Sequence, residues 1–123
     1  MGDVVNIERC FEKFNDTFSP KIVGNVNGQD IKFVRLEGDK VPWHTHDQED
    51  EMFFVLEGIL DVYETDKTVM LQPGEFIIVQ RGVVHRVVPR GHVKLLLVES
   101  EGISHTGDVK SEITLESYDR LDV

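Results

Sequence analysis

Four side chains in the middle of the chain have the types and the spacing of a metal site. His44 and His46 stand two residues apart, and Glu51 and His85 follow them. Side chains two apart on a β-strand point to one face, with Cα atoms about 6.5–7 Å apart, so both imidazoles can reach one ion. Three imidazoles and a carboxylate suit divalent Fe, Zn, Mn or Ni, and also Co or Cu. The sequence therefore predicts one divalent metal ion of open identity.

The chain between these residues must bring them to the same place. Glu51 has the wrong parity for one strand with His46, but the polar run 47–50 is suited to a loop that resets the register. His85 follows the turn signal Arg81-Gly82 and can begin another strand. Histidines on a strand are more often surface or satisfied core residues than ligands, so His-x-His alone is weak evidence. The spacing around it strengthens the metal interpretation.

Most of the chain predicts short β-strands. After residue 20 the apolar pattern has a period of two, and Asn27-Gly28 is a strong hairpin signal. We expect strands at 21–26, 30–37, 52–56, 59–63, 68–71, 76–79, 85–88 and 93–99. Short strands with little helix are typical of a sandwich or barrel. We expect one domain, with a helical segment at 1–19, a barrel at 20–99 and a tail at 100–123.

The first fifteen residues have helical spacing. Val4, Ile7, Cys10 and Phe14 recur three and four apart, and Asp3 is a plausible N-cap. Cys10 is the only cysteine, so no internal disulfide is possible. We interpret it as a small buried apolar residue rather than a reactive thiol.

Charge and apolar run length limit the partners. The formal net charge is −10, from 23 acidic and 13 basic residues. That balance disfavours nucleic acid and anionic membranes, because both require a basic face. No apolar run approaches the roughly 18 residues of a membrane span. With no secretory signal and no disulfide, we expect a cytoplasmic protein.

Two longer patterns resemble the motifs of the cupin family. The stretch Gly38-x5-His44-x-His46-x4-Glu51-x6-Gly58 is similar to the first cupin motif at every signature position. The second motif is matched in part, at Gly74, Gly82 and His85. The chain departs from it at Gln80, where the family usually has Pro, and at Pro89, where it often has Asn. The resemblance covers about residues 30–99, and neither departure is a metal ligand.

The resemblance implies an all-β fold, a double-stranded β-helix (jelly-roll) barrel that is usually dimeric and holds a metal inside its mouth. We therefore expect a homodimer with His44, His46, Glu51 and His85 as ligands. The chain looks most like small single-domain bacterial cupins that are called mannose-6-phosphate isomerase-like. That label reflects fold similarity and does not establish the activity.

Residues beside the site suggest a small-molecule ligand. Phe53 and Val55 share the parity of Glu51 and should line the interior, as should one face of segment 76–79. Tyr63 and Gln80 are possible polar contacts to a ligand.

Three further residues are assigned to the outside of the barrel. Trp43 should point away from His44, toward a subunit interface or the N-terminal helix. We expect His92 and His105 at the surface.

Two classes of function fit these patterns. The first is a metal-dependent enzyme acting on a small organic molecule. Within it, dioxygen chemistry at Fe(II), an oxidoreductase reaction, ranks before Lewis-acid isomerase or lyase chemistry. The alternative is a non-catalytic cupin that binds or scavenges a small molecule.

Overall fold

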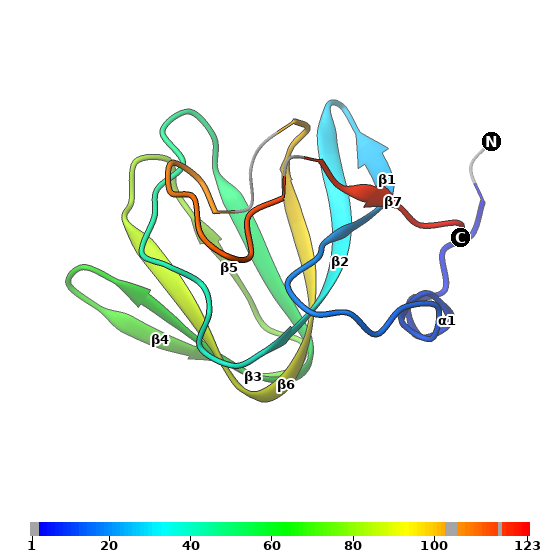
Figure 1. The fold of residues 1–123 in the computed structure, drawn as a ribbon, viewed down its shortest axis with the longest axis horizontal. Coiled ribbons are helices and arrows are strands. Elements are labelled where there is room, and N and C mark those ends of the chain that lie inside the picture. Colours follow the sequence, from blue (N-terminus) through cyan, green and yellow to red (C-terminus); the bar gives the residue numbers. More distant parts are fainter. Residues whose placement is uncertain (1–2, 103–105, 116) are drawn as a thin grey trace.

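A computed structural model describes residues 3–102, 106–115 and 117–123 of the chain. Within these residues it contains one helix and seven strands (Figure 1): α1 (Ile7–Phe11), β1 (Lys21–Val26), β2 (Gln29–Glu37), β3 (Glu51–Glu64), β4 (Thr68–Leu71), β5 (Phe76–Val79), β6 (His85–Ser100) and β7 (Asp119–Arg120). No helix in the described part of the chain is long and apolar enough to cross a membrane.

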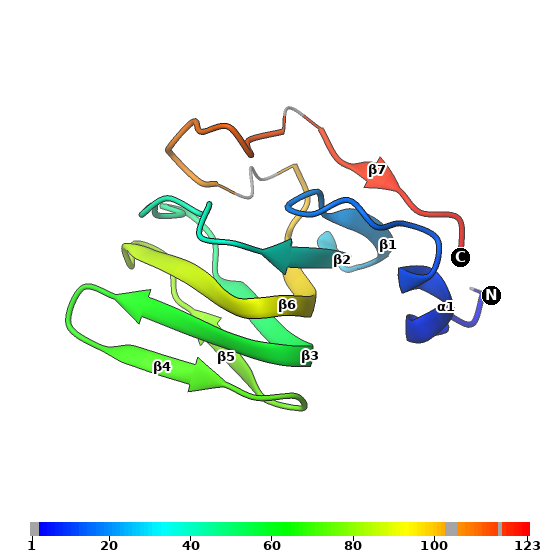
Figure 2. The ribbon, with the colours of Figure 1, turned by 60° about the horizontal axis from the view of Figure 1, so that its bottom comes forward.

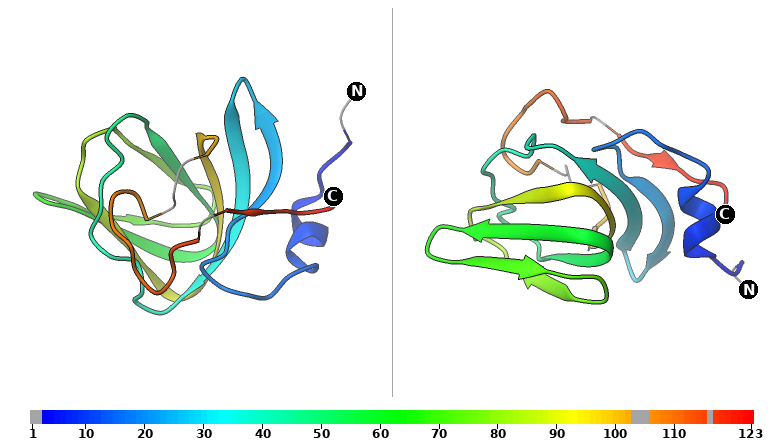
Figure 3. Two further views of the ribbon diagram at one scale, coloured as in Figure 1. Left: turned by 45° about the horizontal axis from the view of Figure 1, so that its top comes forward. Right: turned by 90° about the horizontal axis from the view of Figure 1, so that it is seen from below.

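The strands form one sheet that curls into a barrel (Figure 3). Its order is β4-β3-β6-β2-β1-β7, and β5 pairs with the first part of β3. All pairs are antiparallel except β1 with β7, which run parallel. The predicted strands at 21–26, 68–71 and 76–79 are confirmed to the residue.

Two long strands replace four short ones. The segments predicted at 52–56 and 59–63 form the single strand β3, and those at 85–88 and 93–99 form β6. The two strands stay paired through irregular register around Gly58, where the sheet bends. Gly58 has φ +87°, and a Cβ there would lie 2.4 Å from the carbonyl oxygen of His92. Glycine is therefore required at the bend, and it does not end the strand.

The hairpin at Asn27-Gly28 is confirmed. Val26 pairs with Gln29, so the connection has two residues, and both adopt positive φ, 53° at Asn27 and 79° at Gly28. This is the geometry of a type I′ turn, whose twist matches that of the strands beside it.

The barrel interior is apolar. Phe53, Val55, Val79 and Leu95 belong to its main cluster of buried side chains. Segment 76–79 turns Ile77 and Val79 inward, while Phe76 and Ile78 lie on the outer face.

A second cluster lies under α1, where Cys10 and Phe11 pack against Val23 and Phe33. Cys10 is buried, as expected from its apolar spacing. The helix is shorter than predicted, because only this part of it contacts the barrel. Val4 is 90% exposed, and Asn6 rather than Asp3 is the N-cap, its Oδ1 accepting from the backbone N–H of Arg9 at 2.9 Å.

The C-terminal tail runs back over the barrel (Figure 2). Its end pairs with β1 through β7, and Leu121 donates its backbone N–H to Ile22 at 2.9 Å. Earlier in the tail, before β7, Ile113 packs against the main apolar cluster. The tail therefore forms part of the wall around the barrel interior.

Candidate metal centre

The structure brings the four predicted ligands together. One potential ligand atom from each of His44, His46, Glu51 and His85 lies within 4.8 Å of the other three. All four side chains are buried, at 4% exposure or less. His44 and His46 lie in the loop before β3. Glu51 is the first residue of β3, and His85 is the first residue of β6.

Backbone hydrogen bonds fix the loop that carries the first two histidines. His44 and His85 exchange both backbone bonds at 2.9 Å, and Gly82 donates to the carbonyl of His46 at 2.9 Å. The pair forms an isolated antiparallel bridge, so His44 and His46 lie in a loop attached to the start of β6 and not in a regular strand. These backbone hydrogen bonds, and not a regular strand, orient the side chains of His44 and His46 toward the same centre.

The tautomers of two histidines are set by backbone carbonyls. His44 donates from Nδ1 to the carbonyl of Pro42 at 2.8 Å, and His85 donates from Nδ1 to the carbonyl of Val83 at 3.0 Å. A carbonyl can only accept, so Nδ1 carries the proton in each neutral ring. The Nε2 lone pairs therefore face the centre, as they do in histidines that bind metals.

The atoms that face the centre have no hydrogen-bond partner. They are Nε2 of His44, His46 and His85 and Oε1 of Glu51. Nδ1 of His46 also lacks a hydrogen-bond partner, but it lies on the other side of the ring, 3.5 Å from Oε1 of Glu49. Oε1 of Glu51 lies 3.5 Å from Nε2 of both His46 and His85, which is too long for a strong hydrogen bond. Each buried polar atom without a partner costs about 1–3 kcal/mol. A divalent cation would satisfy these atoms together, so the donor set fits the ion that the sequence predicts.

Electrostatics also favour the ligand forms of two residues. Burial lowers the pKa of His44 to about 4, so its ring is neutral at pH 7. Burial opposes ionisation of Glu51, but the facing imidazoles of His46 and His85 outweigh it and lower the pKa of this carboxyl. For His46, burial disfavours the charged ring, and the carboxylates of Glu51 and Glu49 overcome this and raise its pKa.

A buried ion pair adjoins the centre and was not predicted. Lys32 Nζ lies 2.9 Å from Oε1 of Glu99, and both side chains are fully buried. Burial, followed by the nearby Glu51, raises the pKa of Glu99 well above its ordinary value. The signal was present in the sequence, because Glu99 has the same parity as the buried Leu95 and Leu97 in β6.

An apolar cavity lies beside the ligands. It measures about 410 Å³ with the space open to solvent included, and His44, Glu51 and Phe53 are among its lining residues. The space within it that water can reach is small, with room for about two molecules. The other lining residues are all apolar: Phe18, Pro20, Val34, Leu36, Val41, Val87, Leu95, Leu97 and Ile113. Sequence reasoning had not singled out Phe18 or Ile113, since neither lies near the histidines in the chain.

Three other predicted contact residues lie away from this cavity. Val55 is fully buried in the core but does not line it. Gln80 is exposed in the turn before β6, and Tyr63 is half-buried near the far end of β3, where it pairs with Thr68 and Arg86. None of these three side chains lines the cavity beside the ligands.

Two residues expected on the outside differ in their environments. Trp43 is 44% exposed, while His92 is half-buried and its Nε2 lies 3.0 Å from Arg35. The prediction for His105 falls outside the described residues. Neither Trp43 nor His92 contributes to the ligand cluster.

Comparison with known proteins places this fold and this cluster in a family. The family model described as "Cupin domain" matches residues 33–99. The chain belongs to the cupin family. The all-β jelly-roll prediction is thereby confirmed, and all four candidate ligands lie within the matched region.

Two crystal structures of cupin-sized proteins are similar to this chain. A cupin-2 domain containing protein from Shewanella frigidimarina is 33% identical with a TM-score of 0.77, over 80% of this chain and 95% of that one. Protein NMB1881 from Neisseria meningitidis is 27% identical with a TM-score of 0.72, over 80% of this chain and all of that one.

A curated relative is also similar. The uncharacterized protein YdbB of Bacillus subtilis is 34% identical over 65 residues, which are 52% of this chain and 57% of that protein. The match therefore spans little more than half the length of the relative.

Proposed function

We propose that this cupin binds one divalent metal ion through His44, His46, Glu51 and His85 and uses it to transform a small organic molecule. The observation that carries the proposal is the convergence of buried ligand atoms without hydrogen-bond partners. When bound, Fe(II) would supply dioxygen chemistry, while Zn, Mn or Ni would supply Lewis-acid polarisation. The first gives a dioxygenase-type enzyme and the second an isomerase or lyase; we rank them in that order.

The protein's own residues have separate tasks in this scheme. The carbonyls of Pro42 and Val83 hold two imidazoles in the ligand tautomer before an ion arrives. The apolar wall that includes Phe53 makes the ligand side of the centre largely apolar. A small substrate would bind against this wall with a polar group directed at the ion.

The lining also bears on the substrate class. It contains no lysine or arginine. A sugar phosphate requires such cations, because a buried phosphate must be paired. Thus the cavity supports an unphosphorylated, largely apolar substrate over the sugar phosphate that the isomerase-like label suggests.

A non-catalytic binding cupin is the second candidate. One observation favours it: among the residues that the structure describes, His44 and Glu51 are the only acid–base groups that line the cavity, and both are assigned to the ion. Turnover separates the two candidates. Once the metal is known, an enzyme loses activity in a folded His46→Ala variant, whereas a binding protein shows no turnover with any substrate tested.

We also propose the homodimer that the family resemblance implies. The apolar side chains Phe76 and Ile78 are 55% and 52% exposed on β5, which pairs only with β3 in the described part of the chain. Sedimentation of the wild type and of Ile78→Glu checks this surface. A monomeric wild type contradicts the dimer, and an unchanged dimer in the variant excludes this face.

Elemental analysis of the purified protein tests the metal proposal. We expect near-stoichiometric metal in the wild type and its loss in His44→Ala and His85→Ala. His92→Ala is the matched control, because His92 is a half-buried histidine outside the cluster and should retain the ion. A wild type that holds no metal even after reconstitution would refute the proposal.

A further inference from the structure

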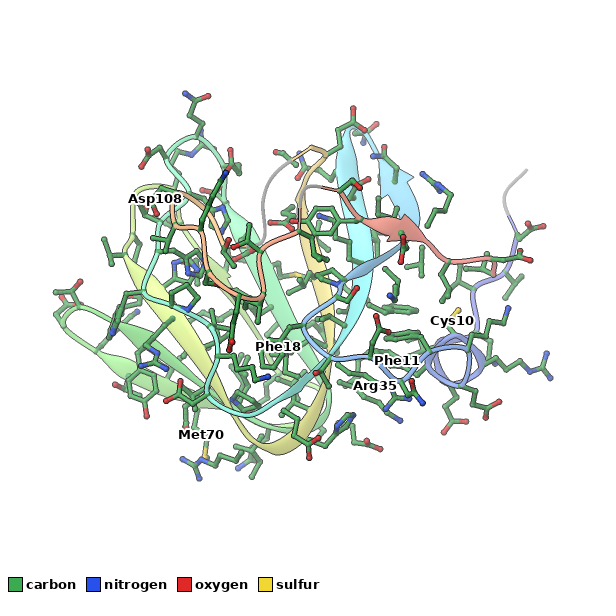
Figure 4. All side chains as sticks on the ribbon, in the orientation of Figure 1. Cys10, Phe11, Phe18, Arg35, Met70 and Asp108 are labelled. Carbon is green, nitrogen blue, oxygen red and sulfur yellow. The ribbon has the colours of Figure 1, made fainter. Side chains whose placement is uncertain are left out.

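The C-terminal tail contacts the candidate metal centre directly. Asp108 accepts from the backbone N–H of Thr45 at 3.1 Å, and it lies beside the histidine loop (Figure 4). At Gly107 a Cβ would lie 2.3 Å from the carbonyl oxygen of Thr45 and 2.9 Å from Cδ2 of His44. This part of the tail is therefore packed against a ligand.

Further along the tail, Ile113 stands between two spaces. It lines the apolar cavity that also contains His44 and Glu51. It also lines an open groove on the surface. Of the residues that the structure describes, Phe18 alone shares both linings with Ile113, so these two side chains lie between the metal side of the cavity and the surface groove.

Phe18, which lines both the cavity and the groove, is held in place by its backbone and its burial. Its φ is 55°, a conformation that is uncommon for a bulky residue. The side chain is 4% exposed, and its backbone N–H donates to the carbonyl of Arg35 at 2.8 Å. Residues kept in such conformations by their surroundings concentrate at functional sites. Ile113, the other residue shared by the two linings, belongs to the C-terminal tail and is the one that we substitute in the test below.

The groove outside the passage is polar. It is lined by the hydroxyl residues Thr17 and Ser19 and by the oppositely charged Lys40 and Glu112. These groups suit a polar end that carries no net charge. The order from inside to outside is thus metal ligands, apolar cavity, apolar constriction and polar groove.

We propose that Ile113 and Phe18 form the constriction through which a ligand reaches the metal centre, and that Ile113 limits the ligand's length. The ligand class is a short molecule with a metal-binding oxygen group, a small apolar body and an uncharged polar end. The role of the oxygen group rests on the proposed metal function, while the constriction itself does not.

Co(II)-loaded protein and a series of alkyl hydroxamates test the length limit by visible absorption. In the wild type, lengthening acetohydroxamate to butyro- and hexanohydroxamate should add little affinity, because the enclosed space is small. In Ile113→Ala each added methylene should tighten binding about fourfold, as expected when a methylene is buried. Ile113→Phe should weaken the longer members. Leu121→Ala is the matched control, since Leu121 lies on the same tail but packs against the cluster under α1.

A titration of metal-free protein with 1-butanol, followed by amide chemical shifts, keeps the two proposals separate. We expect shifts at Phe53 and Ile113, and tighter binding in Ile113→Ala than in Leu121→Ala. Butanol that shifts these residues in a protein that never takes up Co(II) would support the constriction and refute the metal function. Equal butanol affinity and equal hydroxamate length dependence in Ile113→Ala and Leu121→Ala would overturn the role of Ile113.

Discussion

Removing Lys32 should be among the most destabilising changes in this protein. The ammonium is fully buried, lies 2.9 Å from Glu99 and sits 3.6 Å from the centroid of the Tyr118 ring. In Lys32→Met the new side chain has a similar length, so the main effect is the loss of a charged partner for a buried carboxyl. Breaking a buried ion pair costs about 3–5 kcal/mol, and the raised pKa of Glu99 lets its carboxyl take up a proton, which places the loss at the lower end of that range. That is a large part of the roughly 5–15 kcal/mol that stabilises a domain.

Urea denaturation measures the loss, and a second ion pair provides the control. Arg90 donates to both carboxylate oxygens of Asp61 at 2.8 and 2.9 Å, but the arginine side chain is 54% exposed. Arg90→Met should therefore cost clearly less than Lys32→Met, because water screens the exposed guanidinium. The double variant Lys32→Met/Glu99→Leu should recover much of the loss, because it removes both members of the pair and leaves neither buried without its partner.

The comparison between the two pairs decides whether the reasoning holds. If Lys32→Met loses no more free energy of unfolding than Arg90→Met, burial does not set the cost of removing the partner. If the double variant is less stable than Lys32→Met, Glu99 stabilises the barrel through contacts other than Lys32.

Three further predictions concern the ion, the tail and a surface charge. A divalent metal at 100 times its dissociation constant should add about 2.7 kcal/mol to the free energy of unfolding, and a chelator should reverse the rise in Tm. Gly107→Ala should displace the tail from Thr45 and weaken metal affinity, whereas Gly102→Ala, also at positive φ but with nothing within 4 Å of its Cβ, should not; calorimetry of metal binding compares them. Burial opposes ionisation of Asp16, but Lys21, at 2.8 Å, lowers its pKa. The contribution of Asp16 is thus present above pH 4 and lost as the pH falls through the lowered pKa, so Asp16→Asn should be less stable than wild type at pH 7, and urea melts should show this difference shrinking as the pH falls below 4.

Local signals made the hairpins and several strands predictable. Asn27-Gly28 specifies a turn through the φ angles of two residues, which neighbours in sequence determine. Gly58 looks like the same kind of signal, but there a strand bends and continues. Its role depends on the approach of His92, 34 positions further along the chain, and no local pattern contains that contact.

The N-terminal helix was overestimated for a related reason. Val4 and Ile7 have the spacing of a buried stripe, yet both are exposed. The barrel offers an apolar surface to the later part of this segment, where Cys10, Phe11 and Phe14 pack. Periodicity shows which face of a helix is apolar, but the extent of the helix depends on the surface that it meets.

The metal cluster was predictable because the four residue types and their spacing are rare together. The buried pair Lys32 and Glu99 was missed because charged residues are ordinarily assigned to the outside. The available signal was the strand period of two: Lys32 lies on the same face of β2 as the buried Val34 and Leu36.

The metal end of the proposed ligand site lies within the part of the chain that matches the cupin family, and the entrance end lies outside it. The four candidate ligands lie within residues 33–99, the part of the chain that matches the cupin model. Phe18 precedes that part and Ile113 follows it. An argument about the ion can therefore use features that many cupins share, such as the histidine spacing. An argument about the ligand must use the segments outside the match, which close the cavity in this chain. Relatives that keep the histidines and differ in these segments should bind the same kind of ion and accept different molecules.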